Sequence, residues 1–234
     1  IHNFPFSYYQ GPMFSNEINN LNSFKKFEWT SKILNFFFKT LSKEYRSFSM
    51  SLHWSIKDIR PLIWFNQMQS DLPKFEVNPQ YTAIIDSREL NKIEHFKSFL
   101  RRDRKQDLRY AQNNNISLKK SNDKSEIIEL YIDTLKEKNA SVSQVESKIL
   151  DNLMSLAINK KIGYLLKAFN GKKELIAAQF ILEDKLYSHG IALVGLRKYN
   201  KIGVKTLLNL EWMKECLDRN LILDYNGANS PNLA

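Results

Sequence analysis

Apolar residues recur at helical or alternating spacing along much of the 234-residue chain. Helical spacing predicts a helix from about Phe24 to Lys43, whose apolar face is formed by Phe27, Ile33, Leu34, Phe37, Phe38 and Leu41. Strict alternation follows, because Phe48, Met50, Leu52 and Trp54 are separated by single polar residues. This period of two predicts a half-buried strand from Phe48 to Trp54.

A turn-rich segment, SDLPKFEVNPQ, comes next and predicts a domain boundary near residue 79. We therefore expect an N-terminal α/β extension or partial subdomain over residues 1–78 and a main domain over residues 79–234.

Beyond this boundary the pattern predicts helices first and then a sheet. The first expected elements are a strand at Tyr81–Ile85, a basic helix at Arg88–Asn113 and two further helices, the second of which begins with Ser143 and Glu146 at capping-box spacing. Three strands follow, at Gly163–Phe169, Leu175–Leu182 and Lys185–Val194. A helix at Val204–Arg219 and a strand at Leu221–Tyr225 come last. Tight turns join the three central strands into an antiparallel meander. The prediction is an α+β domain with a mixed, mostly antiparallel sheet flanked by helices.

Charge and cysteine content narrow the function classes. Thirty-five Lys and Arg against 25 Asp and Glu give a formal charge of +10, which favours polyanionic partners such as nucleic acid, anionic membrane or phosphorylated cofactors. The single cysteine, Cys216, excludes an intramolecular disulfide and fits a reducing compartment. No transmembrane run or signal peptide is visible, and His2 and His53 have no carboxylate or histidine partner at metal-ligand spacing. We expect a cytoplasmic protein without a transmembrane segment or metal.

A basic loop between the third strand of the meander and the next helix is the best candidate for an anion site. It contains Arg197, Lys198, Asn200, Lys201, Gly203, Lys205 and Thr206. A helix N-terminus offers unpaired N–H groups and the positive end of the helix dipole, and glycine permits close approach of the backbone. The loop is suited to a pyrophosphate, although it lacks the second glycine of a Walker phosphate loop. The alternative is a plain basic turn capped by one glycine.

The order of elements and the run VGLRKYNKIGVKTLL resemble the GNAT N-acyltransferase superfamily. In that superfamily the corresponding loop carries a Q/R-x-x-G-x-G/A motif that binds the pyrophosphate of acetyl-CoA. The match falls on residues 200–205, where Asn200 replaces Gln or Arg and Lys205 replaces the second small residue.

The segments YYQGPMF, RPLIWF, FLRRDRKQDLRYAQNNNISL and LDYNGANSP resemble the FemAB-like and CelD-like branch of this superfamily. The resemblance implies transfer of an acyl or aminoacyl group from acyl-CoA (acetyl-CoA) or aminoacyl-tRNA to an amine of a cell-envelope glycan or peptidoglycan precursor. It leaves open whether residues 1–78 are a partial GNAT-like subdomain or an acceptor-binding extension.

The same resemblance suggests where the chemistry takes place. Backbone N–H groups around Gly190 to Val194, including those of Leu193 and Val194, would hold the donor. Candidate proton acceptors are His189, Asp224 and Tyr225. The alternatives are structural roles: His189 would have its hydrogen bonds satisfied at a sheet edge, and Asp224 would cap a turn through Asn226. The general-acid tyrosine of many family members would lie beyond Ala234.

Two other functions remain open from the sequence. The basic residues Arg101, Arg102, Arg104, Lys105 and Arg109 either contact phosphates of tRNA or a nucleotide-linked sugar, or form a solvated helix face with Asp103 and Asp107. A noncatalytic nucleic-acid-binding module would use this helix. A degenerate GNAT fold that acts only as a scaffold is the other alternative.

Overall fold

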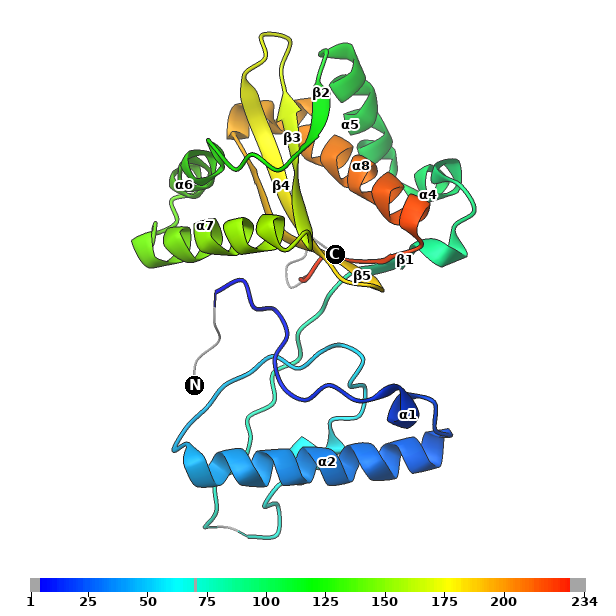
Figure 1. The fold of residues 1–234 in the computed structure, drawn as a ribbon, viewed down its shortest axis with the longest axis vertical. Coiled ribbons are helices and arrows are strands. Elements are labelled where there is room, and N and C mark those ends of the chain that lie inside the picture. Colours follow the sequence, from blue (N-terminus) through cyan, green and yellow to red (C-terminus); the bar gives the residue numbers. More distant parts are fainter. Residues whose placement is uncertain (1–4, 70, 228–234) are drawn as a thin grey trace. The chain divides into compact units, whose positions relative to one another are not determined.

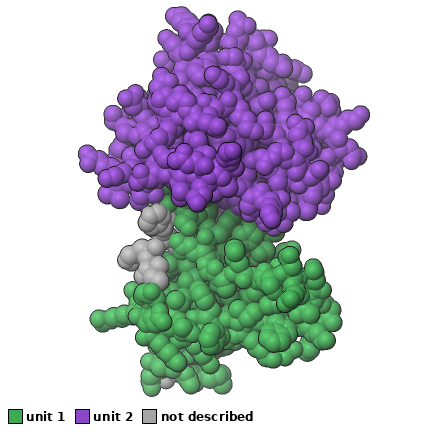
Figure 2. Space-filling model, viewed as in Figure 1, with its two compact units in different colours: residues 1–80 green, residues 81–234 purple. Residues whose placement is uncertain are grey.

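The computed structural model describes residues 5–69 and 71–227 of the chain. The chain divides into two compact units, residues 1–80 and 81–234, which are coloured separately in Figure 2. Each unit has its own hydrophobic cluster.

Unit 1 is built around one long helix. Its helices are α1 (Asn16–Asn19), α2 (Ser23–Glu44) and α3 (Arg60–Ile63). Helix α2 confirms the helix predicted from Phe24 to Lys43, and its N-terminus is capped by the side chain of Asn22, which accepts a hydrogen bond from the Lys25 N–H. Leu34 and Phe38 of α2 are buried against Ile56, Leu62 and Phe65.

The strand predicted from Phe48 to Trp54 is wrong. This segment makes a single parallel bridge, between Leu52 and Gln10, and no ladder. Phe48, Met50 and Leu52 nevertheless pack against the cluster of unit 1. The alternating pattern therefore indicated correctly that one side of an extended segment is buried. Pairing into a sheet also needs a neighbouring strand, and the pattern carries no information about one.

Unit 2 contains one six-stranded sheet (Figure 1). Its strands are β1 (Ile84–Asp86), β2 (Ser117–Ser121), β3 (Gly163–Phe169), β4 (Leu175–Glu183), β5 (Tyr187–Gly195) and β6 (Ile222–Asp224), in the spatial order β1-β6-β5-β4-β3-β2. The antiparallel meander β3-β4-β5 is confirmed. β5 and β6 are parallel, and helix α8 (Val204–Arg219) connects them, so the sheet is mixed as expected.

The structure differs from the sequence prediction in two respects between residues 87 and 121. The single helix expected from Arg88 to Asn113 is divided into a 3₁₀ turn, η1 (Ser87–Glu89), and helices α4 (Ile93–Phe99) and α5 (Arg102–Asn113). The breaks allow Leu90, Ile93 and Phe96 to pack against the core of unit 2 before α5 takes a new direction. Strand β2 was not predicted, because its sequence SLKKS is polar, as suits a strand at the edge of a sheet.

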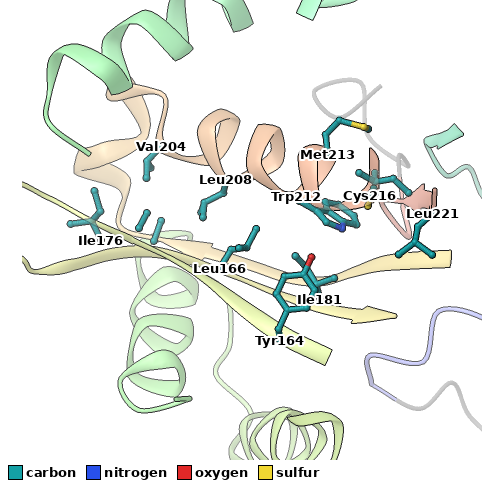
Figure 3. Close-up of a cluster of buried hydrophobic side chains, with 13 residues drawn as sticks. Tyr164, Leu166, Ile176, Ile181, Val204, Leu208, Trp212, Met213, Cys216 and Leu221 are labelled. Atoms are coloured by element: carbon teal, nitrogen blue, oxygen red, sulfur yellow. The ribbon is translucent and has the colours of Figure 1, made fainter. Parts of the chain in front are cut away.

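Helix α8 covers one face of the sheet, and α6 (Ile127–Glu137) and α7 (Gln144–Asn159) cover the other (Figure 1). Val204, Leu208 and Trp212 point from α8 toward the sheet, as Figure 3 shows. The Trp212 indole N–H donates to Ser188 Oγ at 2.7 Å. A Cβ on Gly190 would lie 2.9 Å from the Trp212 ring, so the large side chain on α8 requires glycine at this point of β5.

The start of α8 is held tightly against α5. Gly203 precedes α8 with φ +71°, and a Cβ built on it would lie 2.1 Å from the backbone oxygen of Asp107. Thr206 in the first turn of α8 donates to Asp107 Oδ2 at 2.8 Å. Both the left-handed backbone and the close approach of two chain segments therefore require glycine at position 203.

We expect Gly203→Ala to lower the free energy of unfolding by about 3 kcal/mol, from the left-handed strain and the forced separation of α5 and α8. Gly171→Ala is the control, because a Cβ there meets only Asn115, at 3.9 Å. It should change stability by less than about 0.5 kcal/mol. Urea denaturation measures both, and equal stabilities would show that α5 does not lie against Gly203.

Candidate functional site

A cleft of about 290 Å³ opens where the loop between β5 and α8 faces the end of α6. The loop consists largely of a 3₁₀ helix, η2 (Arg197–Ile202). The cleft is lined by Thr134, Glu137, Lys138, Asn139, Gly195, Arg197, Asn200 and Lys205. Three of these side chains are cationic, so the cleft is suited to an anion.

Three of the loop residues singled out in the sequence lie in this cleft: Arg197, Asn200 and Lys205. Burial lowers the pKa of Lys205, and the nearby charge of Lys138 lowers it further, while Glu137 acts in the opposite direction. A second negative charge in the cleft would stabilise the Lys205 ammonium, which favours anion binding there. The N-terminus of α8 has no side-chain cap, so its first N–H groups are not satisfied by a capping side chain.

The other residues that the sequence predicted to bind the acyl carrier lie outside the cleft. Gly203 and Thr206 contact Asp107 of α5, as described above. Lys201 is exposed and does not line the cleft. Val194 is buried, and Leu193 packs against the core, so only the backbone atoms of these two residues could contact an acyl carrier.

Helix α6 supplies the wall that sequence reasoning missed. Thr134 Oγ1 accepts a hydrogen bond from the Gly195 N–H at 3.0 Å, and Glu137 Oε2 accepts one from the Arg197 N–H at 2.6 Å. These residues are about 60 positions away from the loop in the sequence, and nothing in their local pattern indicates this contact. The local sequence indicates only where α6 ends, because Asn139, with φ +54°, is a residue type that commonly terminates helices.

His189 and Asp224 form the last rung of the parallel ladder between β5 and β6. Asp224 is fully buried, and its Oδ1 accepts hydrogen bonds from the Thr82 hydroxyl at 2.6 Å and from the Asn226 N–H at 2.8 Å. Its Oδ2 lies 3.7 Å from His189 Nδ1. The structure therefore brings together two of the three predicted proton acceptors. The alternative role of Asp224, which was to cap a turn through Asn226, is also observed.

Asn226 orients the His189 ring. Its Nδ2 donates to the Gly190 carbonyl at 3.1 Å, so its Oδ1 is the atom that faces His189 Nδ1, at 3.2 Å. Because both Asn226 Oδ1 and the Asp224 carboxylate are acceptors, Nδ1 carries the hydrogen. In this tautomer Nε2 is the nitrogen that carries the lone pair, the atom that a general base uses.

Tyr225 is placed differently. Its ring packs edge-on against Trp212, with ring centroids 5.2 Å apart, and burial raises the pKa of its phenol to about 12. A phenol with this pKa stays protonated at neutral pH, so Tyr225 is not suited to accept a proton.

The cleft and the His189 rung lie at opposite ends of one stretch of β5. β6 ends at Asp224, opposite His189, whereas β5 continues from Gly190 to Gly195 and into the cleft. Six residues of strand correspond to roughly 20 Å. A ligand that spans both ends needs an anionic group connected to its reactive group by a long extended arm.

Helix α5 carries a second basic surface, which we call the α5 stripe. It is formed by Arg102, Lys105, Gln106, Arg109, Tyr110 and Asn113, and it lines a hollow of about 600 Å³. Arg101 and Arg104 lie outside the stripe and pair with Asp103 and Asp107. The ion-pair interpretation of this helix therefore holds for Arg101 and Arg104, and phosphate contact by the stripe residues stays a prediction.

Residues 5–69 and 71–227 contain no group of three or more His, Cys, Asp or Glu side chains placed to hold a metal ion. Within the same ranges, no helix has the length and apolar character needed to cross a membrane.

No protein-family model and no curated protein matches the sequence. Solved structures do match. FemX covers 86% of this chain with 69% of its own length, at 9% identity and a TM-score of 0.60. A conserved protein of unknown function from Bacteroides thetaiotaomicron covers 71% of this chain, at 10% identity and a TM-score of 0.53, with 58% of its own length aligned. A GNAT-family acetyltransferase from Staphylococcus aureus covers 43% of this chain with 67% of its own length, at 21% identity and a TM-score of 0.35.

The fold is similar to that of FemX, as the resemblance to the FemAB-like branch implied. Its mixed α+β sheet flanked by helices confirms the predicted fold class. The chain spans about half the length of several of the matching structures, from 46% to 58%. At these identities the likeness shows the fold alone, and the function has to be argued from the site.

Proposed function

We propose that the protein is a cytoplasmic N-acyltransferase that moves an acyl or aminoacyl group from a phosphorylated carrier to the amine of a cell-envelope glycan or peptidoglycan precursor. The carrier is acyl-CoA or aminoacyl-tRNA. The observation that carries the proposal is the arrangement along β5, where a cationic cleft and an oriented histidine lie roughly 20 Å apart on one strand.

In this proposal the two ends of the site have separate tasks. The cleft binds the phosphates of the carrier through Arg197, Asn200 and Lys205. The carrier arm extends along Gly190–Gly195, and backbone N–H groups on this stretch hold the carbonyl of the acyl group. The fold that the chain shares with FemX is compatible with this arrangement.

His189 acts as the general base. The acceptor amine attacks the acyl carbonyl carbon, and His189 Nε2 takes the proton that the amine nitrogen loses. The tetrahedral intermediate then breaks its bond to the carrier. The departing sulfur or ribose oxygen takes the proton back from His189 Nε2 and leaves as the free thiol or hydroxyl, which restores the base. Asp224 and Asn226 are positioning residues, because they fix the ring through Nδ1.

The donor site is tested by thermal unfolding with acetyl-CoA. A ligand at 100 times its Kd should add about 2.7 kcal/mol to the free energy of unfolding of the wild type. Lys205→Gln should lose most of this gain, because Lys205 lines the cleft. Lys201→Gln removes the same charge outside the cleft and should retain it. Equal losses in both variants would contradict this placement of the donor.

The base is tested by turnover of acetyl-CoA with a peptidoglycan peptide that carries a free amine. His189→Gln should lower kcat by about 10²- to 10⁴-fold and remove the limb of the pH profile that reports the base. His95→Gln, the same substitution at an exposed position on α4, should leave kcat and the profile unchanged. An unaltered pH profile in the His189 variant would exclude it as the base.

The α5 stripe favours one second candidate, a noncatalytic nucleic-acid-binding module. Its three cations have no acidic partner in the described residues, and the exposed Tyr110 offers a ring for base stacking. A fold that only scaffolds a partner would bind neither ligand.

The nucleic-acid candidate predicts steep salt dependence of binding to single-stranded RNA. Arg102→Gln and Arg109→Gln should each reduce the slope of log K against log salt by about 0.7, the value for one phosphate contact on a single strand. Lys119→Gln, an exposed change on β2 outside the stripe, should leave the slope unchanged. Fluorescence anisotropy measures these slopes, and identical slopes in all variants would exclude the stripe as the binding surface.

A further inference from the structure

Glu137 places a carboxylate inside the cleft that we assign to the carrier phosphates. Its Oε2 accepts a hydrogen bond from the Arg197 backbone N–H at 2.6 Å. Such an N–H, at the start of a basic loop, is a group that a phosphate oxygen would use. Among the described residues that line the cleft, Glu137 is the one acidic side chain, and Lys138, Arg197 and Lys205 are the cationic ones.

The charge of Glu137 affects the same lysine that the phosphates would contact. Lys205 is partly removed from water, and Glu137 is the group that opposes the loss of its proton, while Lys138 promotes that loss. A carboxylate that accepts from a loop N–H and balances a half-buried ammonium does what a bound phosphate oxygen would do.

A purely structural role for Glu137 is the simplest alternative, because its hydrogen bond connects α6 to the loop. A separate contact already makes this connection, however. Thr134, one turn earlier on α6, accepts from the Gly195 N–H and is buried, whereas Glu137 is exposed. Glu137 can therefore leave the loop while Thr134 still holds α6 against β5.

We propose that Glu137 is an intramolecular competitor for the carrier. It occupies the phosphate position in the unliganded protein, and the incoming phosphate displaces it from the Arg197 N–H. The consequence is that Glu137 weakens donor binding. This inference rests on the proposed donor site and adds a residue that regulates it.

Inorganic pyrophosphate is the probe, and isothermal titration calorimetry on the full chain measures its Kd. Glu137→Gln removes the charge and keeps an acceptor oxygen, and Glu137→Ala removes both. Each should bind pyrophosphate about tenfold more tightly than the wild type, since a nearby like charge is lost.

Asp133→Asn is the matched control. It removes the same charge one turn earlier on α6, outside the cleft, where Asp133 Oδ1 lies 3.7 Å from Lys136 Nζ. Its Kd should stay within about twofold of the wild type.

A second measurement does not depend on affinity. The backbone amide resonance of Arg197 in ¹⁵N NMR spectra should shift in Glu137→Ala without ligand, and pyrophosphate should shift it back toward the wild-type position. Asp133→Asn should leave this resonance in place. A resonance that does not respond to Glu137→Ala would overturn the inference, because the hydrogen bond would then be absent in solution.

The outcomes separate the two proposals. If the wild type and the Glu137 variants bind pyrophosphate with equal Kd, the competitor role is overturned and the donor site stands. If no variant binds pyrophosphate and acetyl-CoA does not stabilise the wild type, the donor site itself is wrong, and the competitor role falls with it.

Discussion

The contact between Gly203 and the backbone of Asp107 is the constraint on which the candidate site depends. It fixes where α5 crosses the start of α8, and thereby the direction in which the loop between β5 and α8 presents its side chains. Any side chain at position 203 would separate the two helices. Because Gly203 and Thr206 are directed toward α5, the cleft is left to Arg197, Asn200 and Lys205. A glycine that resembles part of an anion-binding motif is thus required here by helix packing.

The end of the ladder between β5 and β6 is the second determinant of the site. The two strands pair only as far as His189 and Asp224, and the rest of β5 extends past β6 to the cleft. One strand therefore connects an oriented histidine to a cationic cleft. Helix α6 completes the cleft and also places Glu137 within it, so the same helix that builds the site brings a competing negative charge. In the proposed function, this cleft binds the carrier phosphates and Glu137 weakens that binding.

Local pattern predicted the fold well where elements are amphipathic and long. Helix α8 and the meander β3-β4-β5 lie where periodicity placed them, since each buries one regular face. Prediction was wrong for the segment from Phe48 to Trp54, where burial occurs without a partner strand, and for the helix from Arg88 to Asn113, which is broken so that Leu90, Ile93 and Phe96 can reach the core. Strand β2 was missed because a polar edge strand has little apolar periodicity.

The sequence by itself determined the composition of the basic loop, the glycine before α8, and the presence of His189 on one strand and of Asp224 at the end of the next, because these depend on residue type and local spacing. Only the tertiary structure decided which loop residues face the cleft, which face α5, and that Glu137 and Asn226 belong to the site. Those decisions depend on contacts between residues as far as 99 positions apart, such as Thr206 with Asp107. Local periodicity carries no information about such contacts, since it records which face of an element is buried and not what covers it.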